Sequence, residues 1–315
     1  VNVATGVHTN ITAQLPTVFA DTAYDTPTPD FPPFTGFGGI QWSSDDRFLY
    51  LNDQYDVWRV APDGSGGTRL TNGAADRIVS RIQVLDRSAK GLDPGQPLYF
   101  TLTGERTKQT GFAWLPPKGR LERLVLRDAR LGRLVKADSV ATFLYQEERF
   151  DDSPDLVVAG AGLATPRQLT QTNSFQSDYA WGRAELVDYT TSAGRALQGA
   201  LFFPAGYQPG ARYPMIVNPY EIRSTELHAY SVPSERSYYN VQGWTQQGYF
   251  VLLPDIVFRW REPGPSTVEA LEAAVAAVVA KGSVDAKRVG LVGHSWGGYE
   301  ATYVPTRSHI FAAAV

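Results

Sequence analysis

A serine between two glycines near the end of the sequence has the surroundings of a catalytic nucleophile. Residues 289–292 read Val-Gly-Leu-Val, an apolar run typical of a buried strand. They lead into Gly293-His-Ser295-Trp-Gly297, where the glycines permit a tight turn and close backbone packing. A serine at a sharp turn between a strand and a helix is exposed for attack on acyl groups. The pattern predicts Ser295 as a nucleophile, and a tight glycine turn without catalysis is the alternative.

The order of catalytic residues sets a second expectation. When a serine occupies such a turn in the α/β-hydrolase fold, its Asp or Glu and its His follow later in the chain. Only 20 residues follow Ser295, and the sequence starts at Val1 rather than Met. We therefore expect a chain truncated at both ends, with the acid and the histidine beyond Val315 and no activity in residues 1–315 alone. The four histidines are poor candidates for the base; they are His8, His228, His294 and His309.

Composition excludes several classes of function. Hydrophobic residues make up 43% of 315 residues, which is enough for about two domains with cores. The net charge is −3 and Lys and Arg form no long run, so we expect a small-molecule or peptide substrate and no nucleic acid. The absence of cysteine excludes disulfides and a thiol nucleophile. Residues 270–280, the longest apolar stretch, are too short to span a bilayer, so no membrane segment is expected.

The sequence predicts no metal or cofactor, and it leaves the cellular location and the oligomeric state open. The Asp pairs at 45–46 and 151–152 lack the ligand spacing of calcium or zinc sites, so we predict no metal and no cofactor. Both a cytoplasmic and a periplasmic or secreted location are compatible with the composition, and so is a homo-oligomer.

A repeat in residues 1–180 predicts a β-propeller. Short β segments alternate there with clusters of Gly, Pro, Asp and Asn. Arg-Leu-Thr-Asn at 69–72 recurs as Gln-Leu-Thr-Gln at 168–171, and the two Leu-Thr pairs lie 99 residues apart. Half of that spacing is about 50 residues, close to one propeller blade, and residues 121–126 fall where the intervening repeat would end. We predict a partial propeller of about three blades, with an ordinary β-meander as the alternative.

Residues 181–315 have the pattern of a second domain with a mostly parallel sheet. A Ser266-x-x-Glu269 capping box predicts the start of a helix, and Gly282 predicts its end. Pro305 should shorten the helix that follows Ser295. Strands alternating with helices indicate right-handed crossovers and the N-terminal part of an α/β-hydrolase domain. The predicted strands are residues 185–189, 200–203, 215–218, 251–254 and 289–292, with the start of a sixth at 312–315.

This organisation resembles the prolyl oligopeptidase family of serine peptidases, particularly its dipeptidyl-peptidase-like and acylaminoacyl-peptidase-like bacterial members. The resemblance rests on a propeller joined to a hydrolase domain with Gly-His-Ser-Trp-Gly-Gly-Tyr at the turn. Segments 201–207, 213–217 and 284–289 also occur in the family's order. The resemblance implies a serine peptidase that hydrolyses short peptides, with the propeller restricting access to the site.

The resemblance also implies roles for two residues beside the nucleophile. Tyr220 matches the position from which many family members direct a tyrosine hydroxyl into the oxyanion hole, although residues 218–222 lack the glycines that often follow this tyrosine. The side chain of Trp296 would line the pocket for the residue before the scissile bond. Its backbone N–H is a second oxyanion donor, because it follows the nucleophile at a helix N-terminus. The alternative for both side chains is ordinary packing.

Two further alternatives remain open. Glu147-Glu148 is similar to the acidic pair with which dipeptidyl peptidases bind a substrate's amino terminus, but a polar hairpin loop is the favoured interpretation. An esterase or other acyl hydrolase could use the same turn, since fold and nucleophile do not fix the leaving group. A non-catalytic binding protein that carries a propeller is the third class.

Overall fold

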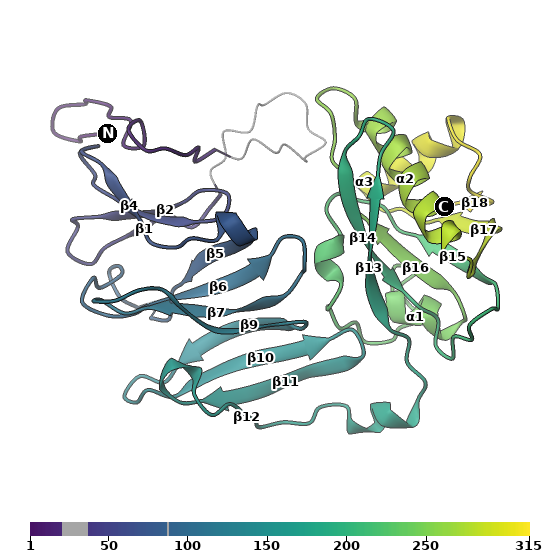
Figure 1. The fold of residues 1–315 in the computed structure, drawn as a ribbon, viewed down its shortest axis with the longest axis horizontal. Coiled ribbons are helices and arrows are strands. Elements are labelled where there is room, and N and C mark those ends of the chain that lie inside the picture. Colours follow the sequence, from purple (N-terminus) through teal and green to yellow (C-terminus); the bar gives the residue numbers. More distant parts are fainter. Residues whose placement is uncertain (21–36, 87) are drawn as a thin grey trace. The chain divides into compact units, whose positions relative to one another are not determined.

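The computed structural model describes residues 1–20, 37–86 and 88–315, which form two compact units (Figure 1). Among these residues, the first unit contains 1–20, 37–86, 88–147 and 155–170. The second contains 148–154 and 171–315.

The first unit is built on three four-stranded sheets (Figure 1), in each of which the strands lie in sequence order; only the end of β10 and the start of β11 belong to the second unit. Neighbouring strands of the first two sheets are antiparallel. Such four-stranded meanders are the blades of propellers. The strands are β1 (Gln41–Trp42), β2 (Leu49–Asn52), β3 (Val57–Val60) and β4 (Gly67–Arg69); β5 (Ile78–Gln83), β6 (Leu98–Gly104), β7 (Thr110–Leu115) and β8 (Glu122–Arg127); β9 (Arg130–Lys136), β10 (Phe143–Arg149), β11 (Asp152–Ala159) and β12 (Arg167–Gln168).

The Leu-Thr repeat of the sequence has a structural cause. Thr71 Oγ1 donates to Asp56 Oδ1 at 2.7 Å and accepts the N–H of the residue after Asp56 at 3.0 Å. Thr170 Oγ1 donates to Asp155 Oδ1 at 2.7 Å and accepts the N–H of the residue after Asp155 at 2.9 Å. In both blades the threonine hydroxyl donates one hydrogen bond and accepts another. These two bonds attach the segment after the last strand of the blade to the third strand.

The second unit is built on a six-stranded sheet with the order β13-β14-β16-β15-β17-β18. β13, β14 and β16 pair antiparallel, whereas β16, β15, β17 and β18 are parallel neighbours. This mixed sheet, with the helices around it, confirms the predicted α/β-hydrolase part of the fold, as the three blades confirm the propeller part. The strands are β13 (Ala184–Thr190), β14 (Ala196–Phe202), β15 (Tyr213–Val217), β16 (Phe250–Pro254), β17 (Val284–Leu291) and β18 (Ala313–Ala314).

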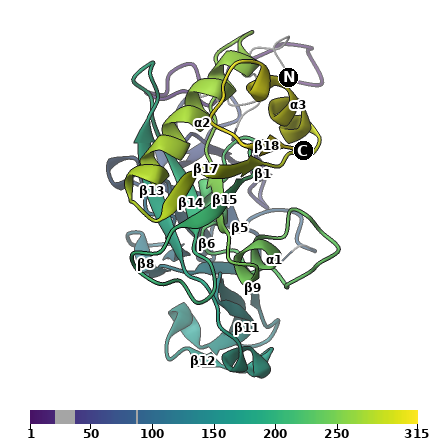
Figure 2. The same ribbon diagram turned by 90° about the vertical axis from the view of Figure 1, so that its right-hand side faces the viewer.

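Helices cover both faces of this sheet (Figure 2). Leu201 packs with α2 and α3 on one face, whereas its neighbours Ala200 and Phe202 pack with α1 on the other. Side chains of a strand alternate between faces, so both faces of β14 are buried. The helices are α1 (Val241–Gln246), α2 (Pro263–Ala280) and α3 (Trp296–Tyr303), and the 3-10 turns are η1 (Ala74–Asp76), η2 (Ala161–Leu163), η3 (Ser174–Asp178), η4 (Ser224–Glu226) and η5 (Val304–Thr306).

The predicted capping box of α2 is wrong, although its predicted end is right. The helix begins at Pro263, so Ser266 lies inside it and donates to the Glu262 carbonyl at 2.7 Å. Proline suits the first helical turn, where its missing N–H costs nothing. Glu269 therefore does not cap; it forms an ion pair with Arg259 at 2.6 Å. Gly282, with φ of 90°, follows the last turn in the left-handed conformation expected of a helix stop.

The helix after the nucleophile is short, as Pro305 predicts. α3 ends at Tyr303 and continues only as the 3-10 turn η5, which contains the proline. In the part of the chain that Figure 1 draws in colour, no helix combines the length and apolar character that crossing a bilayer requires.

Candidate active site

Ser295 lies at the sharp turn between β17 and α3, and its backbone is strained. Its φ of 54° and ψ of −119° belong to a region that residues with a Cβ rarely adopt. The turn is tight enough that a Cβ at Gly293 would lie 1.9 Å from the Gly297 carbonyl oxygen. Glycine is therefore required at 293 by close approach, and the serine side chain is left exposed.

The start of α3 offers a hydrogen-bond donor next to this serine. Among the described residues, neither the Ser295 hydroxyl nor the Trp296 N–H has a hydrogen-bond partner. A free N–H at a helix N-terminus carries partial positive charge and favours a nearby anion. The geometry can therefore stabilise an oxyanion that forms next to Ser295.

Tyr220 lies at the same edge of the sheet as Ser295. It follows β15, and Ser295 follows β17, which is the parallel neighbour of β15. A Cβ at Gly297 would lie 3.7 Å from Tyr220 Cδ2 and 2.6 Å from the Pro219 carbonyl oxygen. The Tyr220 loop thus rests on the first turn of α3, and the side chain is 39% exposed. Within the described part of the chain its hydroxyl has no hydrogen-bond partner.

Two contacts that the sequence did not reveal support the turn from either side. Asn218 Nδ2 donates to the Val292 carbonyl at 2.8 Å, which ties the Tyr220 loop to the end of β17. Tyr239 donates its hydroxyl to the Gly293 carbonyl at 3.3 Å. Desolvation and the neighbouring Tyr238 raise the pKa of Tyr239 to about 12, so this donor keeps its proton at neutral pH. The His294 ring lies 5.3 Å from the Tyr239 ring.

The Trp296 side chain is half-buried among aromatic rings. It stacks on Tyr299 at 4.6 Å and meets Phe258 edge-on at 5.9 Å. Its Nε1 is buried without a hydrogen-bond partner. One helical turn further on, Glu300 is fully buried and its Oε2 also lacks a partner. The same face of α3 therefore holds a donor and an acceptor that are both unsatisfied.

Glu300 has the surroundings of a neutral carboxylic acid. Thr267 Oγ1 lies 3.0 Å from the Pro263 carbonyl and 3.2 Å from Glu300 Oε1. A hydroxyl has one proton, and if Thr267 donates it to the carbonyl, the second contact requires a proton on Glu300. Burial raises the pKa of Glu300 to about 9, which agrees with this assignment.

The structure corrects the position of the acidic pair. Glu147 and Glu148 were predicted in a hairpin loop, but they belong to strand β10, which continues to Arg149. The loop prediction is wrong because the turn before β11 contains only Phe150 and Asp151. Glu147 forms an ion pair with Arg127 at 3.1 Å. Within residues 1–20, 37–86 and 88–315 no group of three His, Cys, Asp or Glu could hold a metal.

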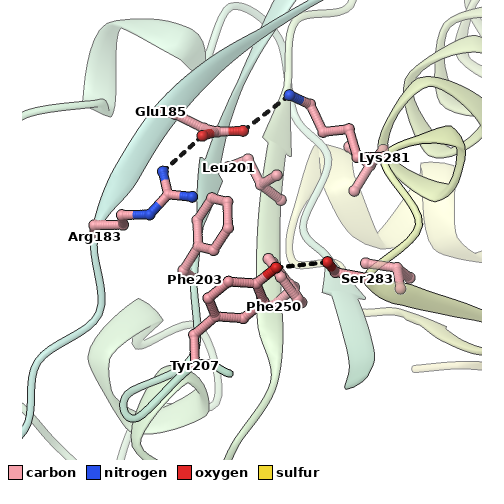
Figure 3. A pocket seen from close by; sticks show the side chains of 10 residues that line it. Arg183, Glu185, Leu201, Phe203, Tyr207, Phe250, Lys281 and Ser283 are labelled. Carbon is pink, nitrogen blue, oxygen red and sulfur yellow. Dashed lines mark hydrogen bonds and ion pairs between the residues drawn. The ribbon is translucent and has the colours of Figure 1, made fainter. Parts of the chain in front are cut away.

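A cavity of about 230 Å³ lies at the opposite edge of the second unit's sheet (Figure 3). It is lined by Phe250 and Val284, the first residues of two parallel strands, so it is remote from the carboxyl ends that hold Ser295. Its polar groups already pair with one another: Glu185 with Arg183 at 2.7 Å and Lys281 at 3.0 Å, and Tyr207 with Ser283 at 2.7 Å. Each charged or hydroxyl side chain among the described residues that line this cavity therefore already has a partner.

Comparison with known proteins gives one sequence match. Residues 258–315 match the model of the prolyl oligopeptidase family. No curated protein sequence is similar enough to count as a relative.

Solved structures share the fold. The chain is similar to dipeptidyl peptidase 4 of Porphyromonas gingivalis, with a TM-score of 0.67 and 17% identity over 87% of this chain and 40% of that one. It is also similar to the AtxE2 isopeptidase, with a TM-score of 0.62 and 19% identity over 85% and 43% of the two chains. A third similar structure is the Pyrococcus horikoshii acylaminoacyl peptidase, with a TM-score of 0.58 and 15% identity over 84% of this chain and 41% of that one. The chain thus spans about two fifths of the length of these structures.

Proposed function

Since the match of residues 258–315 confirms the resemblance to the prolyl oligopeptidase family, we propose that Ser295 is the nucleophile of a serine peptidase. One observation carries this proposal: Ser295 is exposed, strained and adjacent to a free N–H at the start of α3. The chemistry is acyl transfer. The Ser295 hydroxyl attacks the carbonyl carbon of a peptide, an acyl-enzyme forms as the amine leaves, and water releases the acid.

The oxyanion of the tetrahedral intermediate has two candidate donors. The Trp296 N–H follows the nucleophile directly, and the Tyr220 hydroxyl belongs to the loop that rests on Gly297. Donors aimed at a developing charge contribute most when they are held in place before the reaction. Within the described residues the Ser295 hydroxyl has no hydrogen-bond partner, and we propose that the histidine and its acidic partner belong to sequence beyond residue 315.

A fluorophosphonate probe, which reacts with activated serines, tests the nucleophile. We expect the full-length protein to be labelled stoichiometrically and the Ser295→Ala variant to remain unlabelled. The chain of residues 1–315 should also remain unlabelled, because an unassisted serine hydroxyl has no base to accept its proton. Labelling of residues 1–315 that disappears in Ser295→Ala would show that the base lies within this chain. A full-length protein without labelling would refute the proposed nucleophile.

Tyr220→Phe tests the oxyanion donor. The change removes one hydroxyl and keeps the ring, so kcat should fall by about 10² to 10³ while KM changes less. Steady-state kinetics of the full-length protein on a chromogenic peptide measure both constants. Tyr249→Phe, which alters a tyrosine packed on Trp244 of α1, is the matched control. An unchanged kcat for Tyr220→Phe would assign the oxyanion role to other donors.

Short peptides are the proposed substrates. The supporting observation is that the first unit consists of propeller blades, and the solved structures that share both units carry the names of peptidases. Parallel assays with peptide and ester substrates decide the leaving group. A higher kcat/KM on esters alone would favour an acyl hydrolase, and labelling without turnover of either class would favour a binding role.

A further inference from the structure

We propose that Asp255 is a positioning residue whose buried carboxylate fixes the loop carrying Tyr220. This inference rests on the proposed function, in which the Tyr220 hydroxyl stabilises the oxyanion. Asp255 is remote from Ser295 in sequence and would act on the reaction through the tyrosine.

The Asp255 side chain lies at the end of β16 and accepts three hydrogen bonds from one loop. Its Oδ1 accepts the backbone N–H groups of Arg223 and Ser224, both at 2.7 Å. Its Oδ2 accepts the Ser224 hydroxyl at 2.6 Å. The side chain is only 5% exposed, so water cannot readily replace these donors. Charge-assisted bonds of this kind are stronger than neutral ones.

Asp255 is itself held by the sheet. Its N–H donates to the Gln198 carbonyl of β14 at 2.8 Å, and its carbonyl accepts the Tyr189 hydroxyl of β13. The next residue, Ile256, donates its N–H to the Glu221 carbonyl at 2.8 Å. Through Asp255 and Ile256, residues 221–224 are therefore attached to the sheet of the second unit.

The opposite end of the loop is fixed to the nucleophile turn. Asn218 bonds the Val292 carbonyl, and the Pro219 carbonyl lies against Gly297. Tyr220 thus lies between two anchored points, Asn218 on one side and residues 221–224 on the other. Removing the Asp255 carboxylate would release Arg223 and Ser224 and leave this side of the loop held by the Ile256–Glu221 bond and by the bond from Arg223 to the Asn218 carbonyl.

The tyrosine depends on this anchor because its own contacts do not fix the hydroxyl. That hydroxyl has no hydrogen-bond partner among the described residues, and the ring is partly exposed. Its position therefore follows the backbone. A catalytic group that is misplaced by about 1 Å can lose about 10²-fold in rate. Loosening the loop should lower kcat through Tyr220 alone.

A double-mutant cycle in the full-length protein tests this coupling. Asp255→Asn keeps the shape of the side chain but removes its charge and one acceptor oxygen. We expect kcat on a chromogenic peptide to fall about 10- to 100-fold with little change in KM. In a Tyr220→Phe background the same substitution should lower kcat less than about twofold, since the hydroxyl it positions is already absent. Asp178→Asn, an exposed aspartate at the end of η3, is the matched control.

Ser224→Ala provides a second variant should Asp255→Asn fold poorly. It removes only the hydroxyl bond to Oδ2 and should lower kcat in the same direction by a smaller factor, again only when Tyr220 is present. Equal losses in the unaltered and the Tyr220→Phe backgrounds would overturn the proposal and assign Asp255 a purely structural role.

Probe labelling separates this inference from the proposed function. If Ser295 reacts with the fluorophosphonate and Tyr220→Phe lowers kcat, but Asp255→Asn and Ser224→Ala do not, only the role of Asp255 is refuted. If Ser295 does not react in the unaltered protein, the proposed function fails, and the positioning role fails with it.

Discussion

Replacing Ser295 by glycine should abolish turnover and stabilise the fold at the same time. The hydroxyl is the proposed nucleophile, and loss of a nucleophilic serine costs about 10⁴- to 10⁶-fold in kcat. The backbone at this position, with φ of 54° and ψ of −119°, is costly for a residue with a Cβ. Glycine relieves about 1 to 3 kcal/mol of such strain and loses about 0.5 to 1 kcal/mol through the greater freedom of the unfolded chain.

The alanine variant separates the two effects. Ser295→Ala should lose the same activity but keep the strain, because alanine retains the Cβ. Urea unfolding of the full-length protein should therefore give the glycine variant about 1 kcal/mol more stability than the alanine variant. Equal free energies of unfolding would show that the turn stores no strain at this residue. Residual turnover above about 1% in either variant would be incompatible with a nucleophilic Ser295.

Glu300→Gln should change how stability depends on pH. The pKa of Glu300 is raised from its ordinary value of 4.5 to about 9; burial is the largest cause, the Thr267 hydrogen bond and Arg223 lower the pKa, and Glu221 raises it. Between these two values the unfolded chain loses a proton that the folded chain keeps, so stability falls as pH rises. Each pH unit in this window costs about 1.4 kcal/mol, which amounts to about 3 to 4 kcal/mol between pH 5 and pH 8.

Glutamine does not titrate, so the substituted protein should lack this contribution. Free energies of unfolding at several pH values should show the difference between Glu300→Gln and the unaltered protein growing in favour of glutamine from pH 5 to pH 8. Glu235→Gln, a change at an exposed glutamate, is the matched control, measured at the same pH values. If the Glu300→Gln curve is parallel to that of the unaltered protein, Glu300 is ionised in the folded state at neutral pH.

The local parts of the candidate site could be predicted from the sequence. Gly293 and Ser295 lie within a few residues of the strand and helix they join, so their spacing alone specifies the turn. The edge position of Tyr220 also follows from local patterns, because parallel neighbouring strands end on the same side of a sheet. The propeller repeat could be recognised in the sequence because Thr71 and Thr170 each bond an aspartate 15 positions earlier, so both blades keep the same residue type at the same place.

The supporting contacts could not be predicted because they join distant segments. Asp255 bonds Ser224, and Glu300 meets Thr267, across more than 30 residues, and no periodicity encodes such pairs. Glu300 also looks like an ordinary polar residue of a short helix until its burial is known. The error at Ser266 has the same origin. A serine three residues before a glutamate fits a cap, but its hydroxyl bonds a carbonyl one turn earlier.

The order of strands in the second unit has a consequence for how this chain folds. β15 lies between β16 and β17, and Ile216 pairs with Val251 on one side and Gly290 on the other. During synthesis β15 therefore emerges well before either neighbour, with Met215 and Val217 still exposed to water although both are fully buried in the end. Contacts of such sequence separation form slowly. The turn that carries Ser295 follows β17, the last of the two partners of β15 to be synthesised. Until β17 has paired, one edge of β15 remains open to chaperones or to misassembly.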